Sequence, residues 1–200
     1  MPKTKTRIQK KNEATILAAG LEVFSQYGFR GSTLDMIAEV AGLSKPNLLY
    51  YFPSKDAIYK TLLAQLLENW MEPVYAIDAA GDPVAEILKY AKLKLKMSQD
   101  FPRESRLFAN EIIQGAPQIG EVLHGELRRA IADLAVVVNG WVAAGRVRPV
   151  DPYHLVFSIW SLTQHYADFD VQVRAVMGGT DPMIGAEQHL EDMLRQLLTV

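Results

Sequence analysis

The chain has 200 residues, of which 49% are hydrophobic and 22% are charged, and it contains no cysteine. This balance is typical of a globular protein with a substantial core, and the lack of cysteine excludes disulfides, thiolate metal sites and a cysteine nucleophile. No apolar run reaches the roughly 20 residues that a membrane helix needs, and no signal peptide is recognisable, so we expect a soluble, cytoplasmic protein without membrane contact.

Charge is unevenly distributed along the chain. Residues 1–55 contain eight basic and four acidic residues, which gives a net charge of +4. The remaining residues must then carry −6, because the whole chain has a net charge of −2. A basic head on an acidic body favours a polyanionic partner for the head, although a solvated basic tail would give the same imbalance.

The first third of the chain predicts helices separated by short turns. Apolar residues recur every three or four positions from residue 16 onward, and Gly28 ends that pattern. Either Ser32 or Thr33 can cap the next helix, and Ser44 can cap the one after it, with Pro46 in its first turn. The predicted helices are residues 16–28, Leu34–Ala41, Lys45–Phe52 and 55–71.

Helical periodicity continues through the rest of the sequence, and an aspartate precedes a proline at two of the predicted helix starts. We predict an all-α protein of about nine helices. The later helices are expected at Pro83–Ser98, Pro102–Gln114, Pro117–Ala144, Pro152–Met177 and Pro182–Leu198.

The segment from Thr33 to Lys55 predicts a helix-turn-helix, because three residues that include Gly42 join two short helices. The second helix would read base edges with Lys45 and Asn47, while hydroxyls and ammonium groups beside it would hold phosphates. Residues Lys3 to Lys11 could add contacts as a basic arm. The alternative is an ordinary pair of packed helices. The candidate DNA-binding residues are Thr33, Lys45, Asn47, Tyr50, Tyr51 and Lys55.

Residues 33–55, TLDMIAEVAGLSKPNLLYYFPSK, resemble the signature of the TetR family of transcriptional regulators. The resemblance lies in the opening threonine, Ile-Ala-x-x-Ala-Gly, the serine cap, Leu-Tyr-Tyr-Phe and the closing Ser-Lys. It implies an N-terminal three-helix helix-turn-helix domain over residues 1–55 that binds double-stranded operator DNA. It also implies a C-terminal helical domain over residues 56–200 that binds a small ligand and dimerises, the ligand usually releasing DNA.

The resemblance also implies a homodimer on a palindromic operator. In this fold the last two long helices, here Pro152–Met177 and Pro182–Leu198, pair with the same helices of a second subunit as a four-helix bundle. His165 is then expected in that interface or the core rather than in a ligand site.

The body resembles a pyrimidine-responsive branch of the same family. The matching segments are residues 47–55, 93–95, 105–108, 115–117 and 163–169. The branch implies repression of pyrimidine catabolism that uracil or thymine relieves. An unrelated effector, such as a hydrophobic drug or metabolite, is the alternative.

Four residues are candidates for the ligand pocket. Trp160 and Gln164 are four residues apart and so share a helix face. An indole offers a flat surface to a planar ring, and a glutamine amide offers a donor beside an acceptor, which matches the lactam edge of uracil. Trp70 and Lys94 are further candidates, although the tryptophan could be packing and the lysine could be solvated.

An enzyme and a helical scaffold are the competing classes of protein. The four histidines lack the spacing and the cysteine partners of a zinc site, and no nucleotide-binding loop or nucleophile motif is present. Asp168 lies near His165 in sequence, but no nucleophile accompanies them. We therefore predict no catalytic residues, no metal and no cofactor. A scaffold would not need the basic helix-turn-helix.

Overall fold

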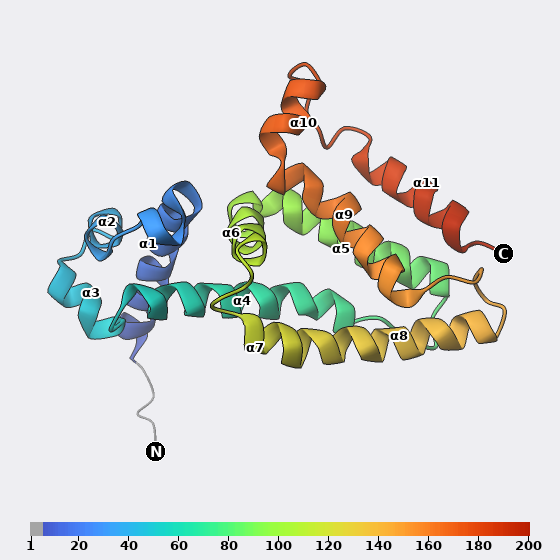
Figure 1. Ribbon diagram of the computed structural model, residues 1–200, viewed down its shortest axis with the longest axis horizontal. Coiled ribbons are helices and arrows are strands. Elements are labelled where there is room, and N and C mark those ends of the chain that lie inside the picture. The colour runs from blue at the N-terminus through green and yellow to red at the C-terminus, as the bar shows by residue number, and fades with distance from the viewer. Residues whose placement is uncertain (1–5) are drawn as a thin grey trace. The chain divides into compact units, whose positions relative to one another are not determined.

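Helices make up all the regular secondary structure of residues 6–200, which the computed structural model describes (Figure 1). No strand occurs within that range, and the prediction of an all-α protein is confirmed. The chain divides into two compact units. Unit 1 comprises Met1–Leu67 and Arg106–Ile119, and unit 2 comprises Glu68–Ser105 and Gly120–Val200. None of the helices described is long and apolar enough to cross a bilayer.

Unit 1 is built on α1 (Arg7–Gly31), α2 (Leu34–Val40), α3 (Lys45–Tyr51) and the first part of α4 (Lys55–Tyr75). A Cβ atom at Gly20 would lie 2.8 Å from the Ile58 side chain, so α1 and α4 approach closely where glycine has no side chain. Each helix contributes at least one fully buried side chain to the core. These side chains are Ile16, Phe24, Ile37, Leu48 and Ile58.

The caps and the turn of the helix-turn-helix are formed as predicted. The hydroxyl of Thr33 caps α2 and that of Ser44 caps α3, each accepting a bond from a backbone N–H in the first turn. Between the helices Gly42 has φ of 64°, a left-handed conformation that glycine adopts without strain. Ser32, the alternative cap, instead donates to the backbone carbonyl of Gly28 at 2.6 Å.

In unit 2, α5 (Pro83–Asp100) packs against α9 (Pro152–Asp168) and α11 (Ala186–Leu198), and α8 (Arg128–Ala143) packs against α9 (Figure 1). The other helical segments of the C-terminal half are shorter. Fully buried side chains from all four packed helices form the core, including Ile87, Tyr90, Leu134, Val138, Leu155, Ile159 and Leu190.

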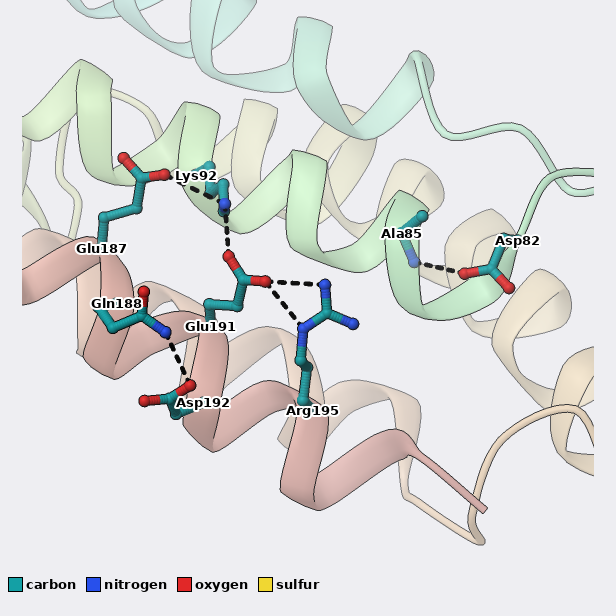
Figure 2. A network of polar contacts seen from close by, with 8 residues as sticks. All are labelled: Asp82, Ala85, Lys92, Glu187, Gln188, Glu191, Asp192 and Arg195. Atoms are coloured by element: carbon teal, nitrogen blue, oxygen red, sulfur yellow. Dashed lines mark hydrogen bonds and ion pairs between the residues drawn. The ribbon is translucent and has the colours of Figure 1, made fainter.

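A chain of ion pairs joins α5 to α11 at the surface (Figure 2). The ammonium of Lys92 lies 3.1 Å from a Glu187 oxygen and 2.6 Å from a Glu191 oxygen, and Arg195 binds the other Glu191 oxygen at 2.7 Å. The hydrogen bond from Lys92 holds the pKa of Glu191 below its usual value. Because these groups are exposed, they contribute little free energy, and we assign them to the register of α11 on α5.

Several helix boundaries differ from the sequence-based predictions. Helix α1 begins at Arg7 rather than at residue 16 and continues to Gly31, with a kink at Gly28, whose φ is 66°. Helix α4 continues past residue 71 to Tyr75. The predicted helix Pro152–Met177 breaks at Phe169, whose φ of −116° and ψ of 29° separate α9 from α10 (Asp170–Val176). No glycine or proline marks that break. The last helix begins four residues later than predicted, because Gly185 has φ of 80° and residues 182–185 form a turn.

The helix predicted from Pro117 begins instead at Gly120. Residues 114–119 form turns, and Ala116 has φ of 54° there. The helix then runs through α7 (Gly120–Val122) and a π-helical turn, η1 (Leu123–Leu127), into α8. The preceding helix, α6 (Pro102–Ile113), agrees closely with its prediction.

Replacing Leu134 with alanine tests the packing of unit 2. Leu134 is 4% exposed on α8, so Leu134→Ala is expected to lower the free energy of unfolding by about 2–5 kcal/mol through lost burial and a cavity. Val136 lies on the same helix but is 72% exposed, and Val136→Ala should change that free energy by less than about 0.5 kcal/mol. Urea titration of both variants measures the difference, and equal losses would contradict this placement of α8.

Candidate DNA interface and ligand site

The outer face of α3 carries three of the predicted DNA-binding residues. Lys45, Asn47 and Tyr50 are exposed, and the Tyr50 side chain is 72% exposed although it is aromatic. Leu48, on the opposite face, is fully buried and fixes the orientation of the helix. A short helix with a buried apolar side and an exposed polar side of this size fits the major groove.

Lys45 forms an ion pair with Asp35 of α2, with 2.9 Å between the two charged atoms. Both side chains are largely exposed, so the pair is weak in water. A DNA phosphate or a guanine edge can therefore compete with Asp35 for the ammonium. Thr33 is exposed at the start of α2, and its hydroxyl accepts a bond from the N–H of Met36.

Tyr51 is half-buried, and its hydroxyl accepts a hydrogen bond from the side-chain amide of Asn12 at 2.7 Å. This bond joins the end of α3 to α1. The Tyr51 hydroxyl keeps its own hydrogen for donation. Tyr51 therefore has a structural contact in addition to the phosphate contact expected of it.

Lys55 also has a structural contact that the sequence did not indicate. Its ammonium donates to the backbone carbonyls of Phe29 and Ser32, at 2.7 Å each, and lies 4.4 Å from the centre of the Phe29 ring. Two of its three donors thus hold the connection between α1 and α2, which leaves one for a phosphate.

The predicted basic arm lies partly outside the described residues, since Lys3 and Lys5 precede residue 6. From Arg7 onward the segment is the first part of α1 rather than a flexible arm, and Thr6 caps that helix. Arg7, Lys10 and Lys11 are exposed on it.

A buried pair in unit 1 joins α4 to the residues that follow α6. Glu111 is 3% exposed, accepts a hydrogen bond from the backbone N–H of Gln118 at 2.6 Å and also hydrogen-bonds Tyr59. Burial and the nearby Glu111 carboxylate raise the pKa of the Tyr59 phenol. The Tyr59 ring packs against Phe24 and Phe29, with centroids 4.9 and 4.8 Å away.

In unit 2, the structure brings the candidates Trp70 and Lys94 together. Lys94 is only 5% exposed, which rules out the solvated alternative, and its ammonium lies 4.9 Å from the centre of a Trp70 ring. Burial lowers the pKa of Lys94 to about 8, and the nearby charge of Asp168 offsets part of that shift. An ammonium in this setting is a strong donor for a carbonyl oxygen.

Trp160 and Gln164 are both half-buried on α9, one turn apart as predicted. One further turn along α9 lies Asp168, which accepts a hydrogen bond from the Ser105 hydroxyl at 2.5 Å and acts electrostatically on Lys94. The indole N–H of Trp160 donates to the Tyr90 hydroxyl of α5 at 2.8 Å. The bond between Trp160 and Tyr90 and the effect of Asp168 on Lys94 thus connect α9 to α5 near candidates on both helices.

A separate groove of about 520 Å³ lies between α5 and α11. Its polar lining is mostly surface lysines and the ion-paired side chains of Figure 2, including Lys92 and Glu191. We do not assign the ligand to this groove, because its charged groups are exposed or paired with each other. Residues 6–200 contain no cluster of three histidine, aspartate or glutamate side chains that could hold a metal ion.

Two family models match the chain in tandem. Residues 16–62 match the model for bacterial regulatory proteins of the tetR family, and residues 63–199 match the model for the C-terminal region of YcdC-like proteins. The chain belongs to the TetR family. This TetR-family protein is 47% identical over 176 residues to the HTH-type transcriptional regulator RutR of Escherichia coli K12, covering 88% of this chain and 83% of RutR.

Two further matches are more distant in sequence. The HTH-type regulator EthR of Mycolicibacterium smegmatis is 26% identical over 134 residues, which covers 64% of this chain and 59% of EthR. A tetR-family regulatory protein from Rhodococcus RHA1 superposes with a TM-score of 0.75 at 19% identity, covering 94% of this chain and 97% of that structure. These proteins are transcriptional regulators, so the TetR-family protein is a DNA-binding regulator and the enzyme alternative is set aside.

The buried charge of Lys94 predicts a pH-dependent stability. The folded-state pKa of about 8 lies below the ordinary value of 10.5, so the unfolded chain binds the proton more tightly between these values. Stability from this group therefore rises as the pH increases from about 8 to 10.5, and the penalty of the buried charge is fully present below pH 8. Relative to Lys94→Met, the wild-type protein should gain about 3 kcal/mol across that window.

Chemical denaturation at several pH values checks this gain, with Lys96→Met as the control because Lys96 is exposed one half-turn away on the same helix. A flat difference between wild type and Lys94→Met would show that Lys94 is solvated.

Proposed function

We propose that the protein is a dimeric, cytoplasmic transcriptional repressor that binds a palindromic operator and that uracil or thymine releases, so that it controls pyrimidine catabolism. Residues 1–55 bind DNA in this proposal, and residues 56–200 bind the effector and dimerise. The observation that supports the effector most directly is the buried Lys94 beside Trp70, together with Trp160 and Gln164 one turn apart on α9, the helix that packs against α5. The 47% identity to RutR over 88% of the chain supports the same conclusion.

The DNA contacts divide by chemistry. Lys45 and Asn47, near the N-terminus of α3, contact base edges. Their side chains are exposed, and the buried Leu48 fixes the orientation of the helix that carries them. Thr33, Tyr50, Tyr51 and Lys55 contact phosphates, which fix the register of the protein without reading sequence. Basic residues of α1 add counterion release.

Exposed residues on α9 and α11 support a homodimer. On α9 an exposed stripe repeats every four residues, and on α11 another does the same beside the buried face. Pairing these stripes with a second copy would form a four-helix bundle. Their members are Tyr153, Phe157, Ser161 and His165 on α9 with Phe169 directly after it, and His189, Met193 and Leu197 on α11.

The chemistry of the candidate pocket residues suits a planar ring with carbonyl groups. Lys94 donates to an oxygen acceptor, the Gln164 amide pairs with an adjacent donor and acceptor, and the aromatic rings offer flat apolar surfaces. Uracil and thymine present all of these features. A site built to hydrogen-bond such edges rejects molecules that leave its buried polar groups unpaired.

Release of DNA follows from thermodynamic linkage between the effector site and the DNA-binding site. The helices α3 of the dimer must lie about 34–36 Å apart to enter successive major grooves. Helix α4 is continuous from Lys55, which holds the helix-turn-helix, to Trp70, which contacts Lys94, so a ligand that moves α4 changes the spacing. The ligand must bind the DNA-free state more tightly, by about 1–3 kcal/mol for typical coupling.

Asn47→Ala tests the assignment of α3 to base reading. The variant is expected to lose about 1–3 kcal/mol of binding free energy on the operator and to relax the preference at one base position, because the loss falls on one base contact. Asn110→Ala, which removes an exposed asparagine from α6, should bind like the wild type. Binding to a set of single-base operator variants measures both, and equal weakening on every sequence would make Asn47 a phosphate contact instead.

Isothermal titration with uracil, thymine and a panel of purines tests the effector. Binding of uracil or thymine with little response to purines is expected, and Gln164→Ala should abolish release of DNA by uracil while leaving DNA affinity nearly unchanged. Gln99→Ala, an exposed glutamine at the end of α5, is the matched control.

The absence of heat with every pyrimidine would overturn the pyrimidine assignment and favour an unrelated effector, such as a hydrophobic drug or metabolite. An unaltered uracil response of Gln164→Ala would remove that residue from the pocket. Neither result bears on the DNA assignment.

A further inference from the structure

The hydrogen bond between Trp160 and Tyr90 occupies the only polar group of the indole. The Trp160 N–H donates to the Tyr90 hydroxyl at 2.8 Å, and an indole has no other donor and no acceptor. Tyr90 is 1% exposed on α5, whereas Trp160 is half-buried on α9. The part of Trp160 that a ligand can meet is therefore its apolar ring surface.

The Tyr90 hydroxyl can accept the hydrogen bond of the Trp160 indole at every physiological pH. Burial raises the pKa of Tyr90 to about 12, so the phenol stays neutral. The neutral oxygen accepts the indole hydrogen bond without placing a negative charge beside the ring. Tyr90 lies four residues before Lys94 on α5, just as Trp160 lies four residues before Gln164 on α9, so each partner of the bond lies one turn from a polar candidate on its own helix.

The fit of a flat ligand depends on the angle of the ring that it stacks against. Without an acceptor at Tyr90, the indole loses the hydrogen bond that orients its N–H and keeps only ring contacts such as that with Phe157, so its N–H would compete for the polar edge of the ligand. Aromatic stacking tolerates small displacements, but paired hydrogen bonds to Lys94 and Gln164 demand a fixed ring plane.

We propose that Tyr90 is a positioning residue for pyrimidine recognition, which holds Trp160 so that the indole presents its ring face, and not its N–H, to the effector. This inference rests on the proposed function of the same site. In this arrangement Lys94 and Gln164 make the hydrogen bonds that select the polar edge of the effector, because the N–H of Trp160 is already bonded to Tyr90.

A double-mutant cycle on uracil affinity tests the inference, measured by calorimetry without DNA. Tyr90→Phe keeps the buried ring and removes only the oxygen, and it should weaken uracil binding about 3- to 10-fold. Trp160→Phe should weaken it by at least as much. In the Trp160→Phe background, Tyr90→Phe should have no further effect, since its action passes through the indole.

Trp141→Phe is the matched control for the tryptophan change. Trp141 is 3% exposed in the same unit, and its indole donates to the backbone carbonyl of Ala79 at 2.9 Å. The same loss of an indole hydrogen bond, in a tryptophan that contacts none of the candidate residues through that bond, should leave uracil affinity unchanged. A merely structural role for Tyr90 would weaken binding equally in both backgrounds, which overturns the inference, as does wild-type affinity of Tyr90→Phe.

Failure of the effector assignment gives a different result. If the wild-type protein binds neither uracil nor thymine, the proposed function is wrong and the inference is lost with it. If the wild type binds and the two changes are additive, only the role of Tyr90 is overturned.

Discussion

The DNA-binding face depends on a small apolar core that holds helices too short to be stable alone. Helices α2 and α3 have seven residues each, and isolated helices of that length do not persist in water. Ile37 and Leu48, both fully buried, attach them to each other and to α1, and Lys55 stabilises the connection between α1 and α2 by donating to two backbone carbonyls. Because the inner face of α3 is used for packing, its outer face is left for polar side chains that can enter a groove.

Unit 2 uses its interior differently, since it encloses a lysine. Taking an ammonium out of water is costly unless other groups compensate it, and here the Trp70 ring and the charge of Asp168 do so. An apolar side chain at position 94 would satisfy packing at lower cost. A buried cation beside a tryptophan ring is therefore better explained by recognition of an acceptor-bearing ligand than by stability.

Much of this arrangement follows from short-range signals in the sequence. The caps at Thr33 and Ser44, the left-handed Gly42 and the one-turn spacing of Trp160 and Gln164 are all local patterns, and the structure has each of them. The Asp-Pro pattern, which marks the true helix start at Asp151-Pro152, gave a wrong start at Asp181-Pro182, because the left-handed Gly185 delays the beginning of α11.

The features that the sequence did not predict are contacts between residues far apart in the chain. Tyr90 and Trp160 are 70 residues apart, and Ser105 and Asp168 are 63 apart, so no local period can pair them. Such pairs depend on the tertiary packing of helices that are distant in the chain, such as α5 against α9.

The central claim is that two copies of α3 read a symmetric duplex, and selection from a library of random duplexes tests it for any operator sequence. The purified protein, at low ionic strength, should enrich an inverted repeat whose half-sites are centred about 10–10.5 base pairs apart or a multiple of that spacing. The enriched duplex should bind two or more chains in even number. Enrichment of asymmetric sites, or no enrichment of any duplex, would contradict the account.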